Sequence, residues 1–128
     1  SSIHTTVHLG AHADAPSHYH AKGVSIDVRH VGRYMGVTQV VRVKGLQAKE
    51  RIGRRHVVTP IQSPRVLFDS GSFPNPERWT NDFNSFDPKF LHELADQGVR
   101  LVGIDTPSVD PADSKALEAH QVLYARDL

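Results

Sequence analysis

Cysteine is absent from the 128 residues, and its absence excludes three classes of protein. Without thiols the chain cannot be a disulfide-stabilised scaffold, a thiolate zinc finger or an enzyme with a cysteine nucleophile. A chain without cysteine is compatible with the cytoplasm, and a cytoplasmic location is what we expect.

Long hydrophobic runs and an excess of one charge are also missing. No apolar stretch approaches the ~20 residues that a membrane-spanning helix needs. Lys and Arg number 15 against 14 Asp and Glu, so the formal net charge is +1. We therefore expect neither nucleic acid nor membrane as a partner. The basic stretch at 47–56 is interpreted as a solvated, exposed connection rather than a phosphate-binding patch.

The order of apolar and turn-forming residues indicates an α/β fold. Residues 38–43 and 65–68 predict strands, and a Pro-, Asn- and Gly-rich loop that holds Trp79 follows at 71–84. Asp87 and Gly98 have the positions of an N-cap and a C-cap for a helix between them, and residues 99–104 predict a mostly buried strand.

Both ends of the chain are expected to be cut rather than finished. Residues 1–7 are rich in β-formers and predict a strand already under way. Residues 115–128 predict a helix with no Gly, Asn or Pro to stop it. We therefore interpret residues 1–128 as one partial domain of a longer polypeptide.

Histidine is the residue that the chain has in excess. There are nine, and five lie within the first twenty positions. In an extended chain His8, His12 and Asp14 would point to the same side, with Gly10 leaving room between them. Pro16 would then turn the chain and bring His18 over the same site. Two imidazoles and a carboxylate suit zinc first, then manganese or iron. The alternative is a polar loop whose histidines bond to backbone and water.

Residues 8–18 resemble the signature His-Thr-Gly-Thr-His-x-Asp-x-Pro-x-His of the metal-dependent cyclase family, and within it the bacterial kynurenine formamidases. A second similar segment runs from Gly98 to Pro111 and is followed by His120. The chain has Leu9-Gly10-Ala11 where the family has Thr-Gly-Thr, a difference that leaves the expected ligands unchanged.

The resemblance implies a swivelling β/β/α fold, a homodimer and a site for two zinc ions, with manganese as a possible substitute. It implies that the first metal is bound by His8, His12 and Asp14. Asp14 would bridge to a second metal that His120 helps to hold, and His18 would be the general acid/base. The family's bridging glutamate is expected beyond Leu128, and its substrate-stacking aromatic residue before Ser1.

The function implied by the resemblance is hydrolysis of N-formyl-L-kynurenine, a small-molecule substrate, to L-kynurenine and formate in tryptophan breakdown. Metal-activated water would attack the formyl group, and the protein would then be an arylformamidase. Two alternatives stay open. One is a ring-opening amidohydrolase of the same family that acts on a cyclic amide such as isatin. The other is an inactive metal-binding fragment.

Overall fold

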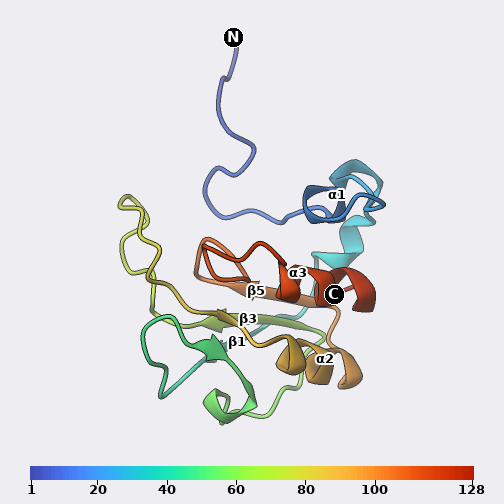
Figure 1. Cartoon of the computed structure of the whole chain (residues 1–128). Helices are drawn as coiled ribbons and strands as arrows, with labels where there is room; N and C mark the ends of the chain where they lie inside the picture. The colour runs from blue at the N-terminus through green and yellow to red at the C-terminus, as the bar shows by residue number, and fades with distance from the viewer.

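Three parallel strands form the main sheet of the computed structural model, which describes residues 1–128 (Figure 1). Their order is β1-β3-β5, with bounds Gln39–Arg42, Arg65–Asp69 and Leu101–Ile104. The register pairs Val41 with Phe68 and Phe68 with Ile104. The parallel sheet confirms the expected α/β class and the three predicted strands, although β5 is half-buried rather than mostly buried.

A second, two-stranded parallel sheet corrects the interpretation of residues 47–56. It pairs β2 (Arg51–Ile52) with β4 (Ser85–Phe86). The side chain of Ile52 is fully buried, so this segment is more than an exposed connection. Its basic side chains do face outward, where they form ion pairs with acidic residues: Lys49 with Asp82, Arg51 with Glu118, and Arg55 with Glu50.

Helix α2 (Pro88–Asp96) begins and ends where its sequence predicts. The Asp87 carboxylate accepts a hydrogen bond from the Lys89 amide at 2.9 Å, and Gly98 adopts the left-handed conformation with φ +87°. The helix packs against α3 (Glu118–Arg126), and both share one core with a face of the sheet. Phe68, Phe86 and Phe90 form edge-to-face pairs at the centre of that core, 5.2 and 5.7 Å between ring centroids.

The N-terminal third of the chain lies outside the sheets. It contains the short helix α1 (Pro16–Tyr19) and the 3-10 turns η1 (Ile26–Val28) and η2 (Val31–Arg33), and a third 3-10 turn, η3 (Arg54–His56), follows β2. Two aromatic pairs join α1 to α3. The His20 ring stacks on Tyr124 with centroids 3.5 Å apart, and the Tyr19 ring lies 4.9 Å from His120. These pairs place a segment near the start of the chain against the helix near its end.

The prediction of a strand at residues 1–7 is wrong. Residues 1–15 are exposed except for a half-buried Ala15, and they contain no strand (Figure 1). A strand is stable only when a neighbour completes its hydrogen bonds, and no segment of the chain pairs with these residues.

The end of α3 also differs from the expectation that nothing would stop this helix. Asp127 adopts the left-handed conformation with φ +51° and ends the helix. Its carboxylate accepts hydrogen bonds from Arg29, at 2.9 Å, and from Arg33. Short polar side chains tolerate this conformation better than most residues do.

The helices of the structure are all too short or too polar to span a membrane.

Substitution of Phe68 by alanine is expected to reduce the free energy of unfolding by about 3–5 kcal/mol, because it leaves a cavity between the other two phenylalanines. Phe68 is 1% exposed, whereas Leu67 beside it is 42% exposed. Leu67→Ala is the matched control and should cost much less. Urea unfolding of both variants measures the difference, and equal losses would contradict this placement of the core.

The carboxylate of Asp127 is expected to stabilise the fold in a pH-dependent way. Burial opposes its ionisation, but the hydrogen bond from Arg29 and the charges of Arg33 and Arg29 lower the pKa of Asp127 below its ordinary value. The stabilisation is therefore present above the unfolded-state pKa, about 3.9, and is lost as the pH falls through the lower folded-state pKa.

Asp127→Asn should lower the free energy of unfolding at pH 7 by about 1 kcal/mol or less, because the side chain is 64% exposed to solvent screening. The difference between variant and unmodified protein should shrink at pH 3. Urea unfolding at both pH values measures it, and a difference that grows toward acid pH would contradict the assignment.

Candidate metal centre

Three side chains near the N-terminus place their polar atoms in a small triangle. His8 Nδ1 lies 2.9 Å from His12 Nε2, and both nitrogens lie 3.3 Å from Asp14 Oδ1. The side chains are about one-third exposed, so the triangle opens to solvent. The three residues that the sequence singled out thus converge on one point.

A turn at Gly10, and not the predicted strand alternation, brings these residues together. Gly10 has φ +62°, a conformation that side chains disfavour. The turn lets the Gly10 carbonyl accept a hydrogen bond from His12 Nδ1 at 2.8 Å. In the neutral ring the proton is therefore on Nδ1, and His12 Nε2 presents a lone pair to the triangle.

The triangle fits a metal ion of the size of zinc. In tetrahedral coordination, bonds of about 2.0–2.2 Å from one ion to nitrogen and oxygen donors set neighbouring donors about 3.3–3.6 Å apart. The two nitrogen–oxygen separations of 3.3 Å match that range, and the two nitrogens, now hydrogen-bonded at 2.9 Å, would move slightly apart around an ion. Two imidazoles and a carboxylate are also the donor types that zinc and manganese accept.

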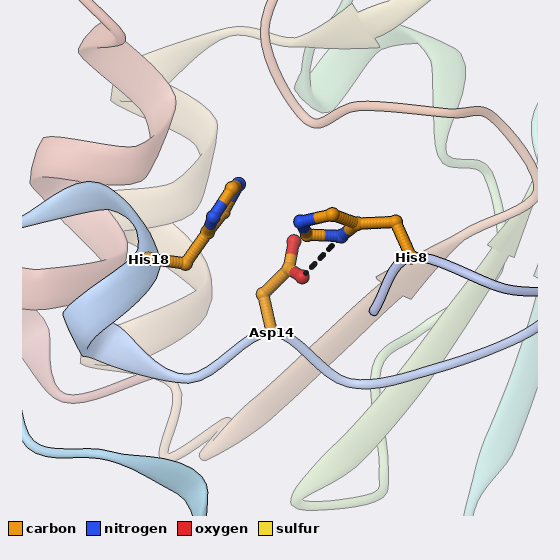
Figure 2. A group of neighbouring side chains, drawn as sticks. All are labelled: His8, Asp14 and His18. Atoms are coloured by element: carbon orange, nitrogen blue, oxygen red, sulfur yellow. Dashed lines mark ion pairs between the residues drawn. The ribbon is translucent and has the colours of Figure 1, made fainter. Parts of the chain in front are cut away.

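His18 lies at the edge of the same cluster, on α1. Pro16 begins this helix, and its turn carries the His18 ring to within 4.3 Å of the His8 ring, centroid to centroid. Figure 2 shows the His18 ring directed toward the His8 ring, with the Asp14 carboxylate next to His8, with which it forms an ion pair. Donor atoms of His8, Asp14 and His18 all lie within 4.8 Å of one another. His18 can therefore reach a molecule held at the triangle.

His120 lies apart from this cluster, in the first turn of α3, and its side chain is 10% exposed. It approaches the cluster through Tyr19, the residue after His18 and the one whose ring it contacts. Sequence reasoning paired His120 with the N-terminal histidines from the resemblance alone. The structure brings it to α1 but gives it no direct contact with His8, His12 or Asp14.

A buried carboxylate beside His120 was missed by sequence reasoning. Asp110 Oδ2 accepts a hydrogen bond from His120 Nδ1 at 2.8 Å. Burial opposes ionisation, but the hydrogen bonds from the His120 ring and from two backbone N–H groups lower the pKa of Asp110 below its ordinary value. One signal in the sequence was Leu117, which stands at the N-cap position of α3. Its side chain cannot accept a hydrogen bond, so the first backbone N–H groups of the helix need an acceptor from another segment.

Three further histidines and Asp105 have structural partners of their own. His30 accepts a hydrogen bond from the Gly32 amide. His56 accepts one from the Gly53 amide, and the His92 ring contacts Arg126. Of these three histidines only His56 is buried. Asp105 accepts hydrogen bonds from Ser70 and Gly71, so it ties the ends of β5 and β3 together as a strand-end carboxylate.

Comparison with known proteins places this centre in a family. The model of the Cyclase family matches residues 1–111, which include the whole N-terminal cluster. The chain belongs to the cyclase family. A solved cyclase-like structure, described as a potential metal-dependent hydrolase with cyclase activity, aligns with 98% of the chain at a TM-score of 0.84 and 23% identity. This likeness concerns the fold.

Several curated relatives in the cyclase family are named kynurenine formamidase. Those of Bordetella petrii, Bordetella pertussis and Delftia acidovorans are 37%, 35% and 38% identical to the chain over all of its length. The chain spans 61% of the length of each of these relatives and 62% of the solved structure. The expected membership of the cyclase family is thus confirmed.

Removal of one of the three side chains that form the triangle is expected to weaken metal binding. His12→Ala should raise the zinc dissociation constant by more than about 100-fold, since even an outer partner of a ligand contributes about 10- to 100-fold. His4→Ala is the matched control because His4 lies in the same exposed segment outside the triangle. Zinc titration by calorimetry measures both. Equal affinity of the two variants would remove His12 from the ligand set.

Proposed function

We propose that the protein is an arylformamidase that hydrolyses N-formyl-L-kynurenine to L-kynurenine and formate, a step of tryptophan degradation. The observation that carries the proposal is the triangle of His8, His12 and Asp14 with the His18 ring 4.3 Å from His8. It is supported by relatives named kynurenine formamidase that are 35–38% identical over the length of the chain.

The proposed cofactor is a pair of zinc ions, for which manganese could substitute. His8, His12 and Asp14 would hold the first ion. Asp14 would share its carboxylate with the second ion, and His120 would also bind that ion. Bound metal of this kind acts as a Lewis acid and makes water a usable nucleophile near neutral pH.

His18 has the proposed role of general acid/base. The attack of water on the formyl carbon requires a group that removes a proton, and departure of the aniline nitrogen requires a group that returns one. His18 lies on a short helix, and its donor atom is within 4.8 Å of those of His8 and Asp14. Imidazole is a common general acid/base in enzymes. The aniline is a better leaving group than an alkyl amine, which eases the second step.

A second candidate function is ring-opening hydrolysis of a cyclic amide such as isatin. It is favoured by the solved structural neighbour, which is described as a potential metal-dependent hydrolase with cyclase activity. Both reactions break an amide C–N bond with the same residues. A panel of N-formyl anilides and cyclic amides separates them, and faster turnover of the cyclic amides would replace the first proposal.

Residues 1–128 are proposed to belong to a single metal-dependent hydrolase domain that acts as a homodimer in the cytoplasm. The support is the absence of cysteine and the resemblance of two separated segments to one enzyme family. Analytical ultracentrifugation tests the dimer, and cell fractionation tests the location. A monomer in the first experiment, or secretion in the second, would contradict the corresponding proposal.

His18→Ala is expected to lower kcat for N-formyl-L-kynurenine by about 10²- to 10⁴-fold, the usual contribution of a general acid/base. Zinc binding should persist, because the three corners of the triangle remain. The absorbance change on formation of kynurenine measures kcat.

His92→Ala is the matched control for the activity assay, since His92 lies on the exposed side of α2 beside Arg126. It should keep the activity of the unmodified protein. Turnover by the His18 variant at the same rate as the control would exclude His18 as the general acid/base. Absence of activity in the unmodified, zinc-loaded protein would favour the non-catalytic, metal-binding alternative.

A further inference from the structure

The Asp110 carboxylate is fully buried, and every hydrogen bond that it accepts comes from the start of α3. Oδ1 accepts from the Ala119 amide at 2.9 Å. Oδ2 accepts from the His120 amide at 3.0 Å and from His120 Nδ1 at 2.8 Å. One side chain thus contacts both the backbone and the ring of the histidine that the proposed function assigns to the second metal.

The backbone around Asp110 fixes the carboxylate in place. The Asp110 amide donates to Ser108 Oγ at 3.2 Å, and the preceding carbonyl of Val109 accepts from the Phe86 amide at 2.9 Å. Phe86 is fully buried in β4. The position of Asp110 is therefore set by the core rather than by α3.

The hydrogen bond to Asp110 determines which nitrogen of His120 carries the proton. An ionised carboxylate only accepts, so His120 Nδ1 must donate. The neutral ring then has a lone pair on Nε2. No hydrogen bond occupies His120 Nε2, which leaves this atom ready to bind a ligand. Carboxylates that orient a metal-binding histidine in this way are a common arrangement.

We propose that Asp110 is a positioning residue that holds the His120 ring in the Nδ1–H tautomer, so that Nε2 can bind the second metal ion. The proposal rests on the proposed function in one respect, the assignment of His120 to that metal. Its competitor is a purely structural role in which Asp110 only caps α3, since Leu117 at the N-cap position supplies no side-chain acceptor.

The first experiment observes the tautomer directly in the metal-free, unmodified protein. Two-dimensional ¹H–¹⁵N NMR of the histidine rings distinguishes the Nδ1–H from the Nε2–H form, and His120→Ala assigns the signal. We expect the Nδ1–H form for His120. Finding the Nε2–H form would overturn the proposal, whatever any variant does.

The second experiment measures metal affinity with Asp110→Asn. An amide presents a donor as well as an acceptor, so it no longer enforces one tautomer, and it lacks the charge that strengthens the bond. Zinc titration of the unmodified protein by calorimetry should resolve two binding steps, and loss of one step in His120→Ala identifies the second site. Asp110→Asn should weaken that step about 10- to 100-fold and leave the first step unchanged.

Asp87→Asn is the matched control, because Asp87 caps α2 with the same kind of bond and contacts no histidine. It should leave both zinc steps unchanged. Urea unfolding of each variant reports the capping contribution separately. Unchanged second-step affinity in a folded Asp110→Asn variant would overturn the proposal, as would the absence of any His120-dependent step in the unmodified protein.

A formamidase assay of the unmodified protein keeps the two proposals apart. An inactive protein with the Nδ1–H tautomer and an Asp110-dependent second step would contradict the proposed substrate and support the role of Asp110. An active protein whose second step does not depend on Asp110 would contradict only the role of Asp110.

Discussion

The stacking of α1 on α3 is the contact on which the candidate centre depends. One half of the proposed centre lies in residues 8–18, and the other would come from residues 110–120. His20 on Tyr124 and Tyr19 beside His120 join these halves. The exposed N-terminal segment has no sheet to hold it, so this aromatic contact fixes where the triangle lies relative to His120. Together the two pairs make α1 a bridge between two parts of the sequence about one hundred residues apart.

The parts of the structure that the sequence predicts are those governed by local chemistry. Asp87 and Gly98 bracket α2 because a cap bonds to its own helix and a left-handed glycine ends it. The triangle is similarly local. His8, His12 and Asp14 lie within seven residues, and their spacing alone indicated that they could share an ion. The three side chains converge despite the incorrect prediction of an extended backbone, because both an extended chain and the turn at Gly10 place them on one side.

The parts that the sequence does not predict depend on long-range partners. Residues 1–7 have the composition of a strand but no strand to pair with, whereas the two residues of β2 find Ser85 and Phe86 more than thirty positions away. The role of Asp110 also depends on the fold, because the three groups that donate hydrogen bonds to its carboxylate lie nine and ten residues later in the chain. Only the fold places the uncapped start of α3 beside the Asp110 carboxylate. The end of α3 at Asp127 likewise involves two arginines from the N-terminal third of the chain.

The two halves of the centre prepare their histidines in different ways, and the difference has a chemical consequence. The His12 ring is oriented by a backbone carbonyl within an exposed turn, and its Nε2 already engages His8 Nδ1. A metal ion that enters there must displace a hydrogen bond, and His8 must change tautomer or lose a proton. His120 is oriented by a buried carboxylate and has a vacant Nε2. In the proposed centre the α3 half would therefore be pre-organised, while the N-terminal half would be completed only when a metal ion binds.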